Sequence, residues 1–334
     1  MIEITQEKVM QNWNGEIPLV SVCCITYNQE PYIAQALDGF LMQKTSFPFE
    51  ILIHDDASTD RTADIIREYE KKFPKIIKPI YQKENQYSKG NRAILASFVY
   101  PRAKGKYIAL CEGDDYWIDE NKLQMQVDFL EKNPEYGMCY SKAKQYIQSK
   151  QKFNKNFVGD AFDGFEDLLK NGSRIPTLTT VYRKDLLDKY QKEIQPGNKG
   201  WLMGDYPMWL YFSHESKMKF FDKVTGVYRV LEESASHSVD VEKQLEFSSS
   251  SYNISKYFAE LYNFEIPEFD IEKRLFDIYF GNFKMSGKTI FLDRMRDVYE
   301  ISNISTLKYK MIYMLSFFPK FLLFVLWIKR LLCK

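Results

Sequence analysis

The sequence predicts an α/β fold in which helices flank a doubly wound mixed sheet, followed by a helical C-terminal region. Up to about residue 115, apolar runs of strand length alternate with segments of helical periodicity, which is typical of parallel βα units. Acidic residues gather where two of these runs end, and that rim of an open α/β sheet is where ligands bind. A chain of 334 residues is long enough to bury a large core in one or two domains.

The first strand is predicted over residues 19–26, because this continuous apolar run suits a central strand that is covered on both faces. Residues 30–43 carry apolar side chains at helical spacing, and Pro31 suits a first helical turn. Residues 49–54 form the next apolar run. The later elements of this half are helix 59–73, strand 76–81, helix 92–102, strand 106–111 and helix 119–132.

Beyond Tyr136 the pattern changes to shorter strands mixed with helices. We expect strands over residues 137–147, 175–182 and 218–230, and helices over residues 164–171 and 204–212. Residues 241–298 have the spacing of helices, with a break at Pro267.

The composition is that of an ordinary globular protein, with 45% hydrophobic and 27% charged residues. The formal charge is only +1 and no basic block lies beside the acidic residues, so we expect no nucleic-acid partner. The five cysteines show neither CxxC nor Cys/His spacing. This favours reduced thiols that fill the core over disulfides or a zinc site.

The C-terminal end is basic and apolar. Residues 301–334 contain six Lys/Arg and no Asp or Glu, but Pro319 and Lys320 interrupt the apolar stretch. Neither half reaches the roughly 20 apolar residues that a spanning helix needs, so an amphipathic helix lying on the membrane surface fits better. Its basic and aromatic anchors would be Lys320, Lys329, Arg330 and Trp327. A true span, or a helix packed in the core or against a partner, remains the alternative.

The first acidic cluster is the segment 55–60, which follows the strand 49–54. Its last three residues are Ser, Thr and Asp, and these residue types satisfy the free N–H groups of a following helix. Capping does not explain Asp55 and Asp56, which stand at the strand end where the N–H donors of a base can be bound.

The second acidic cluster is the segment 112–117. Of its neighbouring acids Asp114 and Asp115, one can coordinate Mg²⁺ or Mn²⁺ while the other accepts hydrogen bonds from ribose hydroxyls. A solvated acidic loop is the alternative. The chain has no GxxxxGK[ST] segment and no GxGxxG in its first strand-to-helix turn, which excludes P-loop and dehydrogenase classes and leaves the handling of phosphate to a metal.

Three segments then carry a specific resemblance. Residues 20–28, 54–60 and 103–117 resemble, in order and spacing, the three successive motifs of family 2 glycosyltransferases, which have the GT-A fold. The resemblance implies an inverting transferase that takes a sugar from a nucleotide diphosphate with a divalent metal, Mn²⁺ or Mg²⁺. It assigns the nucleotide site to Thr26, Tyr27, Glu30, Asp55, Asp56 and Asp114. It assigns the metal to Asp115, with Asp114 beside it.

Two segments of the second half resemble later parts of the family. Residues 201–210 are similar to its acidic motif, with Gly204 in place of the usual acid, and this implies that Asp205 is the catalytic base. Without the resemblance, Asp205 is a first-turn acid of a helix. Residues 227–237 resemble the closing loop of the family. The resemblance implies that Arg229 binds phosphate, with an ordinary salt bridge as the alternative. It also makes His237 a weaker candidate for a metal ligand, with a surface residue as the alternative. Tyr116 and Trp117 either stack on the acceptor or fill the core.

The resemblance also divides the chain. We expect an N-terminal extension over 1–17, a GT-A domain over 18–240, a helical region over 241–300 and a membrane-associating segment over 301–334. Within the GT-A domain, the nucleotide-binding half covers about 18–117 and the acceptor half about 118–240. The enzyme would act in cell-surface polysaccharide synthesis on a glycan or lipid-linked acceptor, in the cytoplasm, as a peripheral protein on the inner face of the membrane.

Three alternatives compete with this assignment. A nucleotidyltransferase can use a similar sheet and acidic metal site, but it would normally have a Gly-rich, basic first turn. A receiver-like signalling domain also crowds acids at strand ends, but it needs a later Lys for which the chain has no good candidate. An inactive transferase-like membrane adaptor would have little reason to keep Asp56, Asp114, Asp115 and Asp205 together.

Overall fold

A computed structural model describes residues 4–231, 241–264, 268–302 and 304–332. The chain divides into two compact units. The first is formed by residues 1–168 and 173–231, and the second by residues 169–172 and 232–334. We describe each unit by itself.

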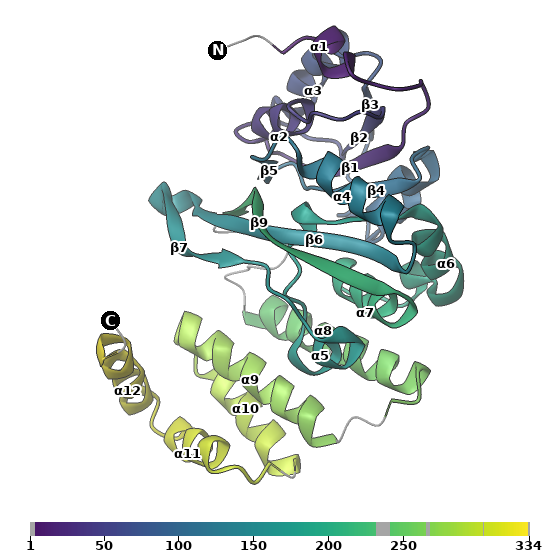
Figure 1. The fold of residues 1–334 in the computed structure, drawn as a ribbon. Helices are drawn as coiled ribbons and strands as arrows, with labels where there is room; N and C mark the ends of the chain where they lie inside the picture. Colours follow the sequence, from purple (N-terminus) through teal and green to yellow (C-terminus); the bar gives the residue numbers. More distant parts are fainter. Residues whose placement is uncertain (1–3, 232–240, 265–267, 303, 333–334) are drawn as a thin grey trace. The chain divides into compact units, whose positions relative to one another are not determined.

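The first unit begins with the short helix α1 (Gln6–Met10) and a parallel half-sheet (Figure 1). Four parallel strands lie in the order β3-β2-β1-β4, so β1 lies between β2 and β4. Their bounds are β1 (Val20–Thr26), β2 (Phe49–Asp55), β3 (Ile77–Tyr81) and β4 (Tyr107–Leu110). Because the strands are parallel, the chain leaves β1, β2 and β4 at the same rim, and the two acidic clusters follow β2 and β4 there.

The sheet continues with strands of both directions, so it is mixed, as predicted. β8 and β6 pair antiparallel, β6 and β9 pair parallel, and β5 adds antiparallel to β9. β7 pairs only with β6 and lies off the main strand path. The bounds are β5 (Tyr116–Trp117), β6 (Tyr136–Ile147), β7 (Lys152–Val158), β8 (Val181–Arg183) and β9 (Lys217–Val230).

Helices in this unit match most of the predicted ones. They are α2 (Ile33–Leu41), α3 (Thr62–Lys72), α4 (Lys122–Lys132), α5 (Gly164–Asn171), α6 (Lys184–Ile194) and α7 (Asp205–Glu215). α1, α6, β5 and β7 were not predicted. The predicted strand 175–182 is mostly irregular, with a 3₁₀ turn at Thr177–Thr179, and only β8 at its end is a strand. The predicted helix 92–102 is instead a π-helix, Leu95–Val99, followed by the 3₁₀ turn Tyr100–Arg102. Pro101 lies in that turn, and a proline has no amide hydrogen to continue a helix.

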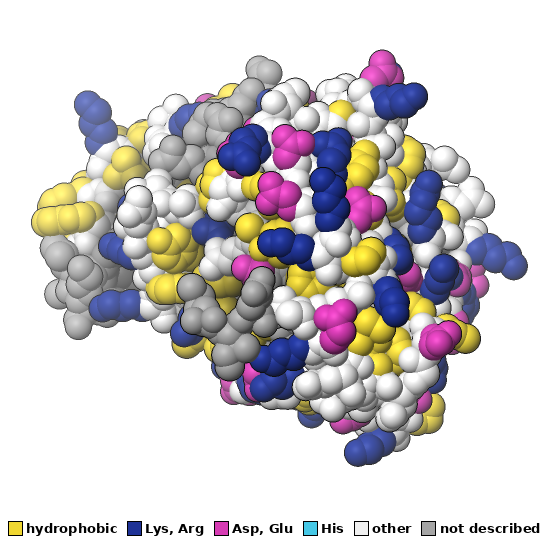
Figure 2. Space-filling model, turned by 90° about the horizontal axis from the view of Figure 1, so that it is seen from above, with side chains coloured by type: hydrophobic (Ala, Val, Ile, Leu, Met, Phe, Trp, Pro, Cys, Tyr) yellow, Lys and Arg dark blue, Asp and Glu magenta, His cyan; other side chains and the backbone are white. Residues whose placement is uncertain are grey.

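The core of this unit is apolar on both sides of the parallel strands, as the continuous runs predicted. Every residue of β2 is buried, and β1 is buried except at its partly exposed Ile25. Cys23, Cys24, Cys111 and Cys139 are free, buried thiols in this part of the chain, which confirms their expected place in the core. On the face of the molecule in Figure 2, basic and acidic side chains are interspersed.

The second unit is helical, as predicted for the C-terminal region. Its helices are α8 (Val241–Leu261), α9 (Glu268–Ser286), α10 (Ile290–Ile301), α11 (Leu307–Ser316) and α12 (Pro319–Leu332). Its core joins side chains from α9 to α12, among them Phe276, Phe283, Leu292, Met295 and Leu322. Within the described residues, no helix combines the length and the apolar character that crossing a membrane requires.

Candidate active site

At the rim, the turn after β1 and the turn after β2 are joined by hydrogen bonds. Asn28 follows β1 in a left-handed conformation (φ 50°), which asparagine tolerates better than most residues. Its side-chain oxygen accepts the N–H of Thr59 at 2.8 Å, and its own N–H donates to the hydroxyl of Ser58 at 2.9 Å. The predicted capping residues Ser58 and Thr59 therefore bind the neighbouring turn rather than the start of α3.

Asp60 completes this junction. One carboxylate oxygen accepts the N–H of Glu30 at 3.0 Å, and the other accepts the N–H of Thr62, the first residue of α3, at 2.9 Å. Burial alone would raise the pKa of Asp60, but the hydrogen bonds from Thr62 and Glu30 hold it below its usual value. Glu30, a predicted nucleotide ligand, accepts the N–H of Arg61 at 3.2 Å with its own carboxylate. The structure thus places Glu30 in the junction of the two turns.

Asp55 and Asp56 are both buried but have different surroundings. One oxygen of Asp55 accepts the N–H of Ser58 at 3.2 Å. Its other oxygen, Oδ1, is buried without a hydrogen-bond partner among the residues that the structure describes. Both oxygens of Asp56 are occupied, because they accept the N–H groups of Gln86 at 2.8 Å and Tyr87 at 3.0 Å. Asp55 therefore retains the buried acceptor that a base N–H can use, whereas Asp56 holds the loop after β3.

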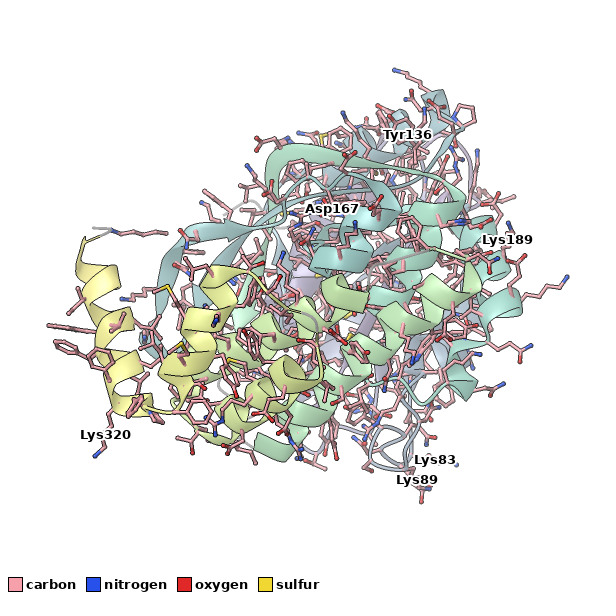
Figure 3. The ribbon with its side chains drawn as sticks, turned by 90° about the horizontal axis from the view of Figure 1, so that it is seen from below. Lys83, Lys89, Tyr136, Asp167, Lys189 and Lys320 are labelled. Atoms are coloured by element: carbon pink, nitrogen blue, oxygen red, sulfur yellow. The ribbon has the colours of Figure 1, made fainter. Side chains whose placement is uncertain are left out.

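The loop held by Asp56 brings an aromatic side chain to the rim. Tyr87 is 46% exposed, and the guanidinium of Arg92 lies 3.9 Å from the centre of its ring. Lys83 and Lys89, labelled in Figure 3, belong to the same segment. At the end of β1, the predicted nucleotide ligand Tyr27 is 44% exposed, while Thr26 is buried and donates to Gln29 Oε1 at 2.7 Å.

The second cluster crowds three carboxyl groups into a turn after β4. Burial, reinforced by the neighbouring Asp114, raises the pKa of Glu112 to about 7. Burial also raises the pKa of Asp114, which the Arg229 guanidinium and Gln29 partly offset. Asp115 is 4% exposed, and its pKa is raised well above the usual range by burial and then by Asp114 and Glu112. A cation bound here would stabilise the ionised form of all three.

Arg229, at the end of β9, organises this turn. Its N–H donates to Asp115 Oδ1 at 2.7 Å, and its guanidinium Nε donates to the Asp114 carbonyl at 2.8 Å. The remaining guanidinium nitrogens donate to Gln148 Oε1 at 2.8 Å and Gln35 Oε1 at 2.7 Å. Arg229 is only 7% exposed. In this structure its guanidinium holds the acidic turn, and its predicted role as a phosphate ligand remains a prediction.

The two halves of the rim meet across the end of β1. Asp56 donates its N–H to the Thr26 carbonyl at 3.0 Å, and Gly113 donates its N–H to the Ile25 carbonyl at 3.0 Å. Gly113 packs closely, since a Cβ atom there would stand 2.5 Å from Gln29 Oε1 and 2.9 Å from Thr26 Cβ. The acidic clusters therefore flank one strand end from opposite sides.

Asp205 is the first residue of α7 and is partly buried. Its Oδ1 accepts the N–H of Tyr206 at 2.7 Å, and its Oδ2 accepts the hydroxyl of Thr177 at 3.2 Å. Burial raises the pKa of Asp205, while these two hydrogen bonds act in the opposite direction. Its charge in turn contributes to the raised pKa of Glu112, so Asp205 lies within electrostatic reach of the second cluster.

The remaining predicted site residues occupy different environments. Tyr116 is partly exposed in β5 and lies 5.4 Å, ring centre to guanidinium carbon, from Arg229. Trp117 is 1% exposed, donates its indole N–H to the Leu178 carbonyl at 2.7 Å, and belongs to the core. Of the two roles left open for Trp117, the structure shows the core one. His237 lies outside the described residues.

The donors at the second cluster fit a metal that the substrate helps to bind. No group of three or more His, Cys, Asp and Glu side chains within the described ranges is arranged to hold a metal by itself. Mg²⁺ and Mn²⁺ bind oxygen donors, and Mg²⁺ usually takes one or two carboxylates, with phosphate oxygens and water completing the shell. Asp114 and Asp115 are adjacent carboxylates that match this requirement.

Sequence reasoning missed the amide side chains that position the acids. Gln29 accepts from Thr26 and interacts with Asp114, while Gln35 and Gln148 bind the Arg229 guanidinium. It also missed Lys122, whose fully buried ammonium lies 4.2 Å from the Trp117 ring. Glutamine has no local pattern that signals such a role, whereas a lysine on the apolar face of helix 119–132 was a detectable irregularity.

Comparison with known proteins assigns the chain to a family. The family model described as "Glycosyl transferase family 2" matches residues 21–191, just over half of the chain. The Escherichia coli UDP-Glc:alpha-D-GlcNAc-diphosphoundecaprenol beta-1,3-glucosyltransferase WfgD is 30% identical over 172 residues, which are 52% of this chain and 63% of that protein. In eight of the curated relatives, the matched stretch spans between 32% and 63% of their own length.

Solved structures share the fold. S. aureus TarS 1-349 in complex with UDP-GlcNAc superposes with a TM-score of 0.58 at 18% identity, covering 84% of this chain and 80% of that one. The mannosyltransferase PcManGT from Pyrobaculum calidifontis, in complex with GDP-Man and Mn²⁺, gives 0.53 at 16% identity, covering 89% and 78%. At these identities the likeness establishes the fold alone. With a family model that matches more than half of its length, the chain belongs to glycosyl transferase family 2.

Proposed function

We propose that the protein transfers a sugar from a nucleotide diphosphate to a glycan or lipid-linked acceptor, with inversion and with the help of a divalent metal, in cell-surface polysaccharide synthesis. The observation that carries the proposal is the meeting of both acidic clusters at the end of β1, with Asp205 in electrostatic reach. The nucleotide-sugar complexes of the fold relatives and the lipid-linked acceptor in the name of WfgD support it. Membership of the family favours it over the nucleotidyltransferase and adaptor alternatives.

The donor would lie across the rim. The buried free oxygen of Asp55, at the end of β2, is suited to accept a base N–H, and the exposed ring of Tyr27 follows the end of the neighbouring strand β1. Asp114 would accept from the ribose, and Asp115 with Asp114 would hold Mn²⁺ or Mg²⁺. When bound, that ion would neutralise the diphosphate leaving group as a Lewis acid.

Asp205 would remove the proton from the attacking acceptor hydroxyl. Single displacement with inversion needs a base on the acceptor side, and burial raises the pKa of Asp205, which makes its carboxylate a better base than an exposed aspartate. Thr177 and the Tyr206 N–H fix the orientation of this carboxylate.

Thermal shift with a panel of nucleotide diphosphates, with and without Mn²⁺, tests donor binding. A ligand that binds only the folded state raises the melting temperature, and Mn²⁺ should enlarge that rise. Asp55→Asn should weaken binding of the preferred nucleotide, while Asp185→Asn, an exposed control on α6, should leave it unchanged. If no nucleotide stabilises the protein with or without Mn²⁺, the proposed donor site is wrong.

Asp205→Asn tests the catalytic base separately. The amide keeps the shape and can still accept from Tyr206, so nucleotide binding should persist while turnover falls by about 10²- to 10⁴-fold. Product formation would be followed with the donor that the thermal shift identifies, and the anomeric configuration of the product would report inversion or retention. Full turnover in this variant would remove Asp205 from the mechanism.

We further propose that the C-terminal helices attach the enzyme peripherally to the inner face of the membrane. α11 and α12 bury Tyr309 and Leu322 in the core of their unit, yet leave a large apolar surface exposed. The exposed side chains include Leu307, Met311, Met314, Phe317, Phe318, Phe321, Phe324 and Trp327. Lys320 projects outward at the start of α12 (Figure 3). Exposed apolar area with basic residues and no acid suits an anionic lipid surface.

Vesicle sedimentation tests this attachment. The protein should pellet with phosphatidylglycerol vesicles and much less with neutral phosphatidylcholine vesicles. Replacing Phe318, Phe321 and Phe324 by Ser should abolish pelleting, whereas replacing the exposed Ile17 and Ile118 of the first unit by Ser should not. Equal pelleting of both variants would locate the membrane contact elsewhere.

A further inference from the structure

The hairpin formed by β6 and β7 has an unusual charge. Residues 136–159 contain five lysines and no acid, in a chain that has 46 basic and 45 acidic residues in total. Lys142 pairs with Asp222, but within the described part of the chain no ion pair engages the other four. These four are exposed: Lys144, Lys150, Lys152 and Lys155. The hairpin is therefore a local source of uncompensated positive charge.

One face of this hairpin also carries exposed aromatic rings. Side chains alternate along a strand, so Phe153, Lys155 and Phe157 point to the same side of β7. Both phenylalanine rings are exposed to solvent, Phe153 to 50% and Phe157 to 52%. On β6, Tyr146 pairs with Phe153 with ring centres 5.0 Å apart, and Lys144 pairs with Phe157.

The same face continues to the second acidic cluster. The Arg229 guanidinium carbon lies 5.7 Å from the Tyr146 ring and 5.4 Å from the Tyr116 ring. Its Nη1 donates to Gln148, at the tip of the hairpin, while its Nε holds the Asp114 carbonyl. A series of contacts thus links Phe153, through Tyr146 and Arg229, to the turn that contains Asp114 and Asp115.

We propose that this face, defined by Lys144, Tyr146, Phe153, Lys155 and Phe157, binds an acceptor glycan that carries phosphate or carboxylate groups. Exposed rings pack against sugar rings or apolar backbone, and ammonium groups bind the anions between them. An acceptor has to bring its hydroxyl to the donor site, and the face ends there. The inference rests on the proposed function, because it takes that rim as the place of transfer.

Binding of defined oligomers tests the proposal on the full chain. The probes are a synthetic oligo(glycerol phosphate), an oligogalacturonate, and a neutral maltooligosaccharide of the same number of units, measured by isothermal titration calorimetry. We expect both anionic oligomers to bind and the neutral one to bind far more weakly. Equal affinity for the neutral oligomer would overturn the proposal.

Two variants separate charge from stacking. Replacing Lys144 and Lys155 by Gln should weaken both anionic oligomers about fourfold, because two solvent-screened contacts worth roughly twofold each multiply together. Replacing Phe153 and Phe157 by Ser should weaken oligogalacturonate, which has sugar rings, more than oligo(glycerol phosphate), which has none. Unchanged affinity in both variants would overturn the proposal.

A matched variant and two further measurements complete the test. Replacing Lys71 and Lys72 by Gln removes the same charge at exposed positions of another surface and should leave affinity unchanged. Equal loss there would mean unspecific attraction and overturn the proposal. The proposal would also be overturned if the hairpin variants lost binding to phosphatidylglycerol vesicles but kept binding to the oligomers.

The nucleotide-induced thermal shift should be the same in the wild type and in the hairpin variants. If the wild type showed no nucleotide-induced thermal shift, the proposed donor site would be refuted, but the proposed glycan binding by the hairpin would not.

Discussion

The two acidic clusters follow β2 and β4, the parallel strands on either side of β1, yet the crowded carboxylates of each cluster are stabilised differently. In the first cluster, the oxygens of Asp56 and Asp60 accept backbone N–H groups, and the pKa of Asp60 is lowered. In the second, Glu112 and Asp115 have raised pKa values, with Asp114 between them. The first cluster is stabilised by the fold itself, whereas the second would be stabilised by a cation that comes with the substrate.

Among substitutions within the two clusters, the largest effect should come from Asp115→Asn. The amide retains an acceptor for the Arg229 N–H but loses the charge proposed to hold the metal, so turnover should fall by about 10²- to 10³-fold. Turnover measured across a Mn²⁺ titration checks this, and Asp60→Asn in the first cluster is the control. The contrast between the clusters fails if both variants lose turnover equally.

Asp56→Asn should loosen the loop that follows β3. Its amide group cannot accept both the Gln86 and Tyr87 N–H groups, which should cost about 1–3 kcal/mol of stability. Chemical denaturation gives the stability, and hydrogen exchange of these two amides gives the local effect. Continued protection of both amides would show that the loop is held by other contacts.

The raised pKa of Glu112 makes stability depend on pH. Between its ordinary value of 4.5 and about 7, folded Glu112 retains a proton that the unfolded chain has released. The metal-free protein should therefore lose about 1–3 kcal/mol as pH rises through this window. Denaturation in EDTA at several pH values measures it. Glu112→Gln should flatten the curve, whereas Glu120→Gln, a partly exposed control, should not. An unchanged curve in Glu112→Gln would exclude this source.

The smallest effect should come from Asp60→Asn. The variant keeps an acceptor for one of the two N–H groups at the junction, so we expect a stability loss of about 1 kcal/mol and turnover close to wild type. Thermal denaturation and steady-state kinetics check the two parts. A loss of turnover without loss of stability would give the first cluster a direct part in the reaction.

The sequence was informative where one local pattern determines the outcome. The runs 19–26 and 49–54 predict β1 and β2 to within one residue, because strands buried on both faces are apolar throughout. The strand β7 escaped prediction because an exposed edge strand needs no apolar face, and its residues are mostly polar. The acids of the site were predicted from their motifs, although their roles as ligands stay predictions.

The positioning of the acids could not be predicted from local pattern. Arg229 binds Asp114, Gln148 and Gln35, which lie 115, 81 and 194 residues away in the chain. Only the folded sheet brings these segments together, and nothing in the neighbourhood of any one of them signals the others. Trp117 was equally ambiguous, since an aromatic residue after a strand suits both a sugar site and the core.

Gly113 allows the second acidic cluster to pack closely against the end of β1. The space where its side chain would stand is filled by Gln29 and Thr26, so a methyl group there would act as a wedge between the ends of β1 and β4. Such a change would move the second cluster away from the first while leaving every acidic residue in place. The spacing between the two acidic clusters therefore depends on the absence of a side chain at Gly113.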